Sequence, residues 1–267
     1  MMINERPLVS VIIASYNSEK TIESCIQSLL NQTYKDIEII ICDDNSSDNS
    51  LAIINRIKEK NPNIVVLHNS TNLKAAASRN RCIEISKGEF LAIQDADDSS
   101  FPNRIEIQVS FLLNHPELDF VSSNARLFNE TNSDLGIMKL GKEFPSKWNF
   151  LWGLPFIHPA TMFRKESIAA VKGYRVAKET RRGQDYDMFM RMYAIGLRGA
   201  NIGQCLYNYR LDENCVKRHG EGAHDEYLVR KYGFKIMGLM PVGYLFAIKP
   251  YISNFAHNLG WFKYNLK

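Results

Sequence analysis

The sequence predicts an α/β fold: a doubly wound, Rossmann-like, mostly parallel central sheet with helices on both faces. Strand-like and helix-like segments alternate through the first half of the 267 residues. The strand-like segments are almost continuously apolar, which is typical of parallel strands buried on both faces. The composition, 45% hydrophobic and 23% charged, is that of an ordinary globular protein. This length allows one large domain, alone or with an appendage.

Short apolar runs, most of them rich in Ile or Val and each bounded by polar residues, predict the strands. The predicted strands are 8–14, 37–42, 63–69, 89–94 and 119–125. Helical periodicity fills the gaps between them, as in the first helix, where Ile22, Cys25, Ile26 and Leu29 share one face. The predicted helices are 18–32, 47–60, 74–88 and 101–116. Right-handed crossovers of this kind make the strands parallel.

The pattern loosens after about residue 126. A polar loop at 129–136 leads to an aromatic segment at 148–166 and to an amphipathic helix at 183–196. We expect these elements to extend the same domain, which would cover 1–214.

Residues 215–267 form a basic and apolar C-terminal extension with eight Lys and Arg against three acids. Within it, 236–248 carries no charge, but a membrane span needs about 20 apolar residues. Two interpretations remain open. Residues 236–263 lie on a membrane surface, with lysines facing anionic headgroups, or helices of the extension pack on the core.

The bulk properties exclude several classes of protein. A net charge of +4 does not favour nucleic acid as a partner. The five cysteines are odd in number and none forms a C-x-x-C pair, so neither a zinc site nor a disulfide framework is indicated. Residues 1–7 are polar and do not begin a signal peptide. We expect a cytoplasmic protein, in solution or peripheral on the inner face of the cell membrane.

Acidic residues follow two of the predicted strands. Asp43 and Asp44 end the second, and Asp95, Asp97 and Asp98 end the fourth. Parallel sheets bind ligands at the carboxyl ends of their strands. Like charges gathered there need compensation, and oxygen ligands suit Mg²⁺ or Mn²⁺ shared with substrate phosphates. The alternative is a solvated turn that caps the next helix.

Four motifs together resemble the family 2 glycosyltransferases, the inverting enzymes of the GT-A fold. They are "VSVIIASYN" at 9–17, "CDDNSSD" at 42–48, "RNRCIEISKGEFLAIQDADD" at 79–98 and "GQDYDMFMRM" at 183–192. The resemblance covers roughly residues 8–212. It implies a nucleotide-sugar-binding half, about 1–126, and an acceptor half, about 127–214. It also implies metal-dependent transfer from a nucleotide-diphosphate sugar, with a UDP-sugar expected, to a glycan or lipid-linked acceptor.

The resemblance implies roles for the donor side. Tyr16 would lie against the nucleotide base, and Asp44, with Asp43, would accept a hydrogen bond from it. Arg79 would contact the base or the diphosphate, and Asp95 the ribose and a metal-bound water.

The resemblance also implies metal ligands. Asp97 would bind Mn²⁺ or Mg²⁺ directly, with Asp98 as a supporting residue or helix cap. His219, beside Arg218, is a third ligand, a lid residue, or part of an exposed loop. Lys74 stands where the family often has glycine, and either contacts a phosphate or is solvated.

On the acceptor side, the family usually has Glu-Asp where this chain has Gln184 and Asp185. Asp185 matches the general base, which takes the proton of the attacking acceptor hydroxyl. The alternative is that Asp185 and Asp187 only favour the positive end of a helix. His158 lies either near the acceptor or in a structural role.

Two other functions are less consistent with the sequence. A sugar-phosphate nucleotidyltransferase would need a glycine-rich loop after the first strand, and "ASYNSEK" at 14–20 has no glycine. A non-catalytic nucleotide-sugar or glycan-binding module at the membrane would be expected to lack the acids or the base, and this chain keeps both.

Overall fold

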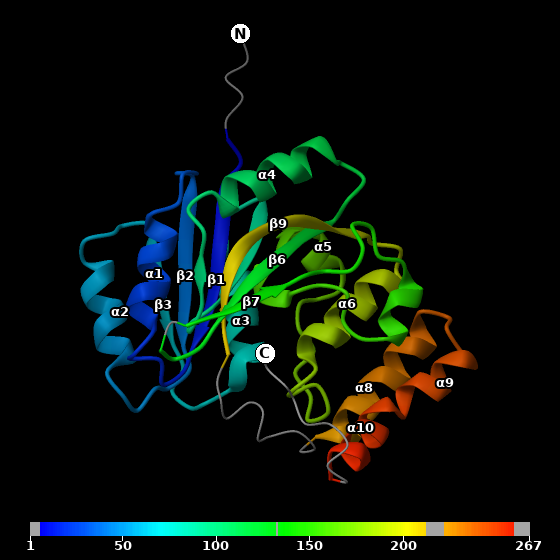
Figure 1. Cartoon of the computed structure of the whole chain (residues 1–267). Helices are drawn as coiled ribbons and strands as arrows, with labels where there is room; N and C mark the ends of the chain where they lie inside the picture. Colours follow the sequence, from blue (N-terminus) through cyan, green and yellow to red (C-terminus); the bar gives the residue numbers. More distant parts are fainter. Residues whose placement is uncertain (1–5, 132, 212–221, 259–267) are drawn as a thin grey trace.

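The computed structural model describes residues 6–131, 133–211 and 222–258. A nine-stranded mixed sheet runs through the molecule, with helices on both sides of it (Figure 1). The predicted α/β class is therefore confirmed.

Four parallel strands form the first half of the sheet, in the order β3-β2-β1-β4. These are β1 (Val9–Ser15), β2 (Ile37–Asp43), β3 (Ile64–His68) and β4 (Phe90–Asp95). All four agree with the predicted segments. Placing β1 in the middle brings the ends of β2 and β4 to either side of it.

The second half of the sheet is mixed. The predicted fifth strand exists as β6 (Phe120–Phe128) but does not neighbour β4, because the three-residue β8 (Met162–Arg164) lies antiparallel between them. The long β9 (Gly199–Arg210) runs parallel to β6. Two short strands complete the sheet: β5 (Ser99–Ser100) on β9 and β7 (Asp134–Met138) on β6.

Alternating strand residues feed two hydrophobic cores. The helices that cover them are α1 (Ile22–Leu30), α2 (Ser50–Lys58), α3 (Lys74–Ile85), α4 (Arg104–Asn114), α5 (Lys165–Ala170) and α6 (Gln184–Ala194). Val11 and Ile13 of β1 face the core beneath α1, α2 and α4, whereas Ile12 faces the core beneath α3, α5 and α6. Two 3₁₀ turns, η1 (Lys147–Leu151) and η2 (His158–Ala160), lie in the aromatic segment.

Three helices follow in the C-terminal extension: α8 (Ala223–Ile236), α9 (Val242–Ala247) and α10 (Lys249–Asn258). Val229 and Phe234 of α8 and Ala247 of α9 are buried in the same core as α6. Part of the extension therefore packs on the core. Among the described residues, no helix is both long and apolar enough to cross a bilayer.

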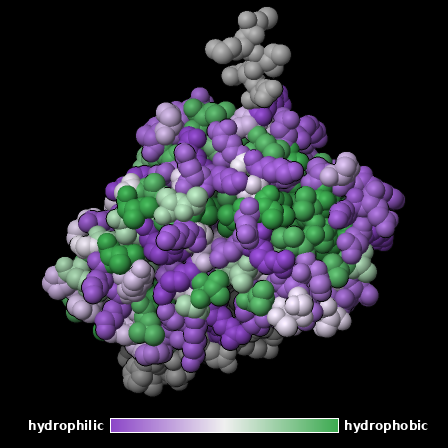
Figure 2. Space-filling model, turned by 180° about the vertical axis from the view of Figure 1, so that it is seen from behind, coloured by the Kyte–Doolittle hydropathy of each residue, from purple (hydrophilic) through white to green (hydrophobic). Residues whose placement is uncertain are grey.

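Figure 2 shows the side of the molecule opposite to that in Figure 1. Hydrophobic residues form several separate groups there, and hydrophilic residues lie between them. This is the ordinary surface pattern of a globular protein.

Candidate active site

The carboxyl ends of β2, β1 and β4 meet at one edge of the sheet, the lower edge in Figure 1. The register pairs Ser15 with Asp43 and Ala14 with Asp95. The backbone N–H of Asp44 donates to the carbonyl of Ser15 at 2.8 Å. The prediction that these distant segments share one rim is confirmed.

Asp44 binds the loop that follows β3 and fixes it at this rim. Its carboxylate accepts hydrogen bonds from Asn69 Nδ2 at 2.6 Å and from the backbone N–H groups of Leu73 and Lys74, each at 2.8 Å. A carboxylate offers about four acceptor positions. The loop that follows β3 is thus fixed by Asp44, and acceptor capacity remains for a further donor.

Asp43 is fully buried beside it and is only partly satisfied. Its Oδ2 accepts from the backbone N–H of Ser46 and lies 3.1 Å from His68 Nδ1. Its Oδ1 is buried without a hydrogen-bond partner among the described residues. Buried polar atoms are rarely left unpaired unless a ligand, ion or water completes them. Tyr16, on the same rim, is half exposed.

Lys74 begins α3 with a φ of +73°, in the left-handed region that favours glycine. This geometry lets its N–H reach Asp44, and it gives a physical reason for glycine at this position in the family. The Lys74 side chain is exposed.

Replacing Lys74 by glycine is expected to relieve this strain and raise the free energy of unfolding by up to about 1 kcal/mol. We expect the donor KM to stay unchanged, because the backbone N–H that binds Asp44 is kept in the variant. Urea denaturation and donor titration measure the two quantities. Lys74→Ala is the control, since it removes the ammonium and keeps the strain. A rise in donor KM in both variants would instead place the ammonium on the diphosphate.

The acidic turn after β4 presents its three carboxylates differently. Asp95 pairs with Arg79 at 2.6 Å, and Asp97 is exposed. Asp98 is buried, and its Oδ1 accepts from the backbone N–H of Arg210 at 2.7 Å. Burial, and then the charges of Asp95 and Asp97, raise the pKa of Asp98 well above its ordinary value. Asp98 is not a helix cap, because Asn103 occupies that position in α4.

A buried arginine lies beneath this turn. Arg104 has no exposed surface, and the ring of Tyr207 lies 4.8 Å from its guanidinium. The Tyr207 hydroxyl accepts from the backbone N–H of Asp95 at 3.1 Å. Burial lowers the pKa of Arg104 to about 10. The guanidinium donates to Gln108 Oε1, Gln94 Oε1, Ser100 Oγ and the carbonyls of Ile93, Pro159 and Thr161. Arg104 therefore ties the end of β4 to β5 and η2.

Arg79 is 93% buried and binds Asp95 through only part of its guanidinium. Its Nη2 binds Asp95, whereas its Nε and Nη1 have no partner among the described residues. The guanidinium lies 5.8 Å from the ring of Tyr174, and the Tyr174 hydroxyl is 2.7 Å from His158 Nε2. Burial, and then the charge of Arg79, lower the pKa of His158 to about 3. His158 is therefore a neutral, hydrogen-bonded support for Tyr174.

Tyr174 and Asn80 belong to this arrangement but were missed in the sequence. The Asn80 side chain donates to the Tyr174 carbonyl and accepts from its N–H, both at 2.8 Å. Gly173 makes this approach possible: its φ is +68°, and a Cβ there would lie 2.5 Å from the Asn80 Oδ1. The sequence signal that could have found them is the polar pair Arg79 and Asn80 within α3. The Arg79 side chain binds Asp95 at the rim, and the Asn80 side chain binds the backbone of Tyr174.

Asp185 lies in the first turn of α6, which begins at Gln184. One of its oxygens accepts from the N–H of Tyr186 at 2.8 Å. Burial raises the pKa of Asp185, whereas the hydrogen bond from Tyr186 and the charge of Arg79 lower it. The charge of Asp95 also acts on it, so the fold brings α6 near the acidic turn.

Asp187, two residues further on, has a different environment. It is buried in ion pairs with Arg175 at 2.9 Å and Arg191 at 2.7 Å. The two acids of this motif are therefore not equivalent, and Asp187 is structural.

The donor set suits a metal that shares its ligands with a substrate. No three His, Cys, Asp or Glu side chains in the described ranges are arranged as a complete metal site. Asp97 is exposed at the turn, and Asp95 uses one oxygen for Arg79. Mg²⁺ is commonly held by one or two carboxylates together with substrate phosphates and water, and these residues fit that pattern. Arg218 and His219 lie outside the described residues.

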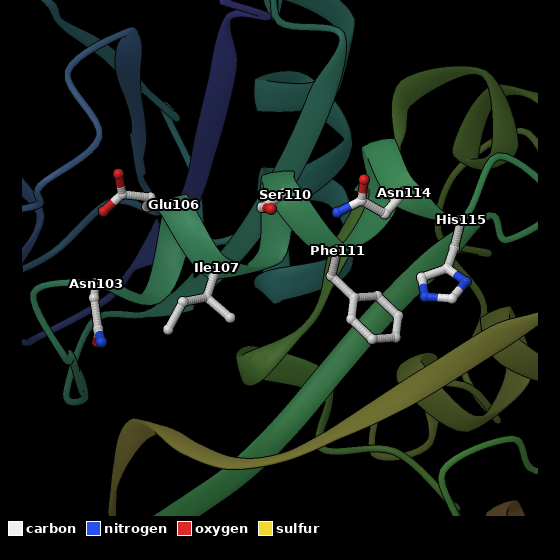
Figure 3. Close-up of a pocket in the computed structure, with 7 residues that line it drawn as sticks. All are labelled: Asn103, Glu106, Ile107, Ser110, Phe111, Asn114 and His115. Carbon is white, nitrogen blue, oxygen red and sulfur yellow. The ribbon is translucent and has the colours of Figure 1, made fainter.

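A separate pocket lies on the outer side of α4. Figure 3 shows the side chains that line it, all from this helix and its two ends: Asn103, Glu106, Ile107, Ser110, Phe111, Asn114 and His115. None of the residues of the acidic rim lines it. The pocket is therefore distinct from the candidate active site.

The family model for "Glycosyl transferase family 2" matches residues 10–171. The putative glycosyltransferase EpsE of Bacillus subtilis is 34% identical over 256 residues, which cover 94% of this chain and 91% of that protein. The Escherichia coli enzyme WfaP is 45% identical over 105 residues, 39% of this chain and 41% of that protein. Its name describes it as a UDP-Glc:α-D-GlcNAc-diphosphoundecaprenol β-1,3-glucosyltransferase.

Solved structures show the same fold. Staphylococcus aureus TarS 1–349 in complex with UDP-GlcNAc has a TM-score of 0.68 at 18% identity, covering 86% of this chain and 70% of TarS. The Pyrobaculum calidifontis mannosyltransferase PcManGT, in complex with GDP-Man and Mn²⁺, has a TM-score of 0.67 at 16% identity, covering 98% and 78%. The GT-A prediction is confirmed. The chain is a glycosyltransferase and belongs to glycosyl transferase family 2.

Proposed function

We propose that the protein is an inverting, metal-dependent transferase that moves a sugar from a nucleotide-diphosphate sugar to a glycan or lipid-linked acceptor. The observation that supports this most strongly is the single rim that gathers Asp43, Asp44, the acidic turn and Arg79, with Asp185 close enough for the charges of Arg79 and Asp95 to act on it. Residues 1–126 would bind the donor and 127–214 the acceptor, with 215–267 as an extension.

The donor would lie along the rim from β2 to β4. Tyr16 would contact the base, and Asp43 and Asp44 would accept its N–H groups. Arg79 Nε and Nη1 have no partner among the described residues, and a guanidinium suits phosphate oxygens, so Arg79 would contact the diphosphate. UDP-GlcNAc in TarS and GDP-Man in PcManGT support a nucleotide-sugar donor of one of these two kinds, and we favour a UDP-sugar.

Asp97, with Asp95 through a water, would hold Mn²⁺ or Mg²⁺. When bound, the metal would neutralise the diphosphate and so stabilise the leaving group. The Mn²⁺ in PcManGT supports this assignment. His219 stays a third candidate ligand.

Asp185 would act as the general base. As the acceptor oxygen bonds to the anomeric carbon, its proton passes to the Asp185 carboxylate, and the bond from that carbon to the diphosphate breaks. The nucleoside diphosphate leaves from the opposite face, which inverts the anomeric centre. A raised pKa suits this role, because a base is most effective when its pKa approaches the working pH. Gln184 would face the acceptor.

The acceptor class is supported by the diphosphoundecaprenol substrate in the name of WfaP. An acceptor of that kind is held in a bilayer, so the enzyme would work at the inner face of the cell membrane.

A thermal-shift screen of nucleotide sugars tests the proposal. A true donor should raise the Tm in the presence of Mn²⁺ and much less without it, because ligands that bind the native state stabilise it by mass action. Uridine without phosphates is the control, since it lacks the groups that share the metal. Stabilisation by a nucleoside triphosphate with a sugar phosphate, and release of pyrophosphate, would favour a nucleotidyltransferase instead.

A further inference from the structure

The C-terminal helices expose an apolar surface next to the aromatic segment. We define this apolar face by Trp148, Trp152, Tyr244, Leu245, Ile248 and Ile252. Leu245 is 73% exposed, Trp152 68% and Ile252 57%. Of the nineteen exposed large hydrophobic side chains in the described residues, eight lie within 148–152 and 242–252. Exposed apolar side chains concentrated in this way mark an interaction surface.

The helices α9 and α10 carry apolar residues both on the apolar face and on the side that packs on the protein. Leu245 of α9, Ile248 between the two helices and Ile252 of α10 are all exposed. On the opposite side, Gly243 lies so close to Phe234 of α8 that a Cβ there would come within 2.8 Å. This inner side of α9 is therefore packed against α8. The two interpretations of the extension are not exclusive, because one side packs on the core and the other faces outward.

The apolar face is joined to the catalytic part of the molecule. The Trp152 ring lies 5.0 Å from that of Phe246, and Lys249 Nζ donates to the Trp152 carbonyl at 2.6 Å. Lys147 Nζ donates to the Met237 carbonyl at 3.0 Å. These contacts hold the C-terminal helices against η1 and Trp152.

The surrounding charge favours an anionic occupant. From residue 227 to the end, the chain has six Lys and Arg and no acid. Lys235 and Lys249 are exposed within the described part of this stretch. A second copy of the chain would bring like charges together. Apolar side chains flanked by lysines, with Trp and Tyr among them, suit the interface of an anionic bilayer.

We propose that the apolar face docks the enzyme on an anionic phospholipid bilayer. This inference rests on the proposed transfer to a lipid-linked acceptor and adds the contact surface and its orientation. α8 packs on α6, where a Cβ at Gly183 would touch Val229 at 3.6 Å. α8, α9 and α10 also lie toward the lower side of the molecule in Figure 1, as the strand-end rim does. Docking would thus present the Asp185 end of α6 to acceptors held at the bilayer surface.

Vesicle flotation of the full chain, without donor or metal, tests the proposal. Wild type should float with vesicles of phosphatidylcholine and phosphatidylglycerol and remain unbound with phosphatidylcholine alone. Ile252→Glu and Leu245→Glu should each weaken binding roughly tenfold, because each introduces a charge that opposes both the apolar and the electrostatic contact. Ile195→Glu is the matched control: Ile195 is also 57% exposed but lies at the end of α6. It should float like wild type.

Three outcomes would overturn the proposal. The first is no flotation of wild type with anionic vesicles. The second is an equal loss in Ile195→Glu. The third is a dimer that sedimentation detects in solution and Ile252→Glu abolishes, which would assign the apolar face to a second copy. Donor binding in solution is measured separately by calorimetry. If docking fails while donor binding is intact, the docking proposal is wrong and the proposed transfer still stands. If the protein docks but binds no donor, only the proposed transfer is contradicted.

Discussion

Asp185→Asn is expected to reduce sugar transfer by roughly 10²- to 10⁴-fold while donor affinity stays close to wild type. The amide keeps the shape of the carboxylate, and its oxygen can still accept from Tyr186, but it cannot take the acceptor proton. Transfer is followed with a radiolabelled donor and binding by calorimetry. Equal loss of binding and transfer would contradict the assignment of the base.

The pH dependence of wild type provides an independent check. Because burial raises the pKa of Asp185, the carboxylate becomes protonated at a higher pH than an ordinary aspartate. The rate should fall as pH decreases through this raised pKa and level off above it. Asp185→Asn should lose this acidic limb, since it has no carboxylate to protonate. An acidic limb that survives in the variant would point to another base.

Asp97→Ala is expected to lower metal-dependent donor affinity by about 100-fold or more, because it removes the exposed carboxylate of the acidic turn. Calorimetry of a nucleoside diphosphate with and without Mn²⁺ measures the difference. Binding without metal should be weak in both proteins.

Asp98→Asn is the matched control, because it changes a buried neighbour that hydrogen-bonds the backbone of Arg210. This variant should retain most of the metal-dependent affinity. If Asp98→Asn lost the metal-dependent affinity and Asp97→Ala kept it, the two assignments would have to be exchanged.

The sequence was sufficient for the parallel half of the fold. Each of its strands is an apolar run between polar boundaries, and the crossover rule orders their ends along one edge. The shared rim of Asp43, Asp44 and Asp95 followed from this. The neighbours β8 and β9 could not be predicted, because β8 has three residues and its pairing with β4 and β6 depends on contacts distant in sequence.

The residues that were missed share a physical reason. Arg104 lies in a helix and would ordinarily be solvated, as most arginines are. Its complete burial depends on acceptors from β4, β5 and η2 that come together only in the folded chain. Tyr174 is likewise recognised only through Asn80 and Arg79. Asp44 was predicted as a ligand residue, yet its role in fixing the loop through Leu73 and Lys74 emerged only from the geometry.

Arg104 also joins two segments of the chain whose relative position is fixed. Its single guanidinium bonds to the strand that ends in the acidic turn and to the carbonyl of Pro159, next to His158. The acidic turn and the segment around His158 are therefore mechanically one piece. Loops that do not contact this junction can therefore change in sequence and length without disturbing the acidic turn.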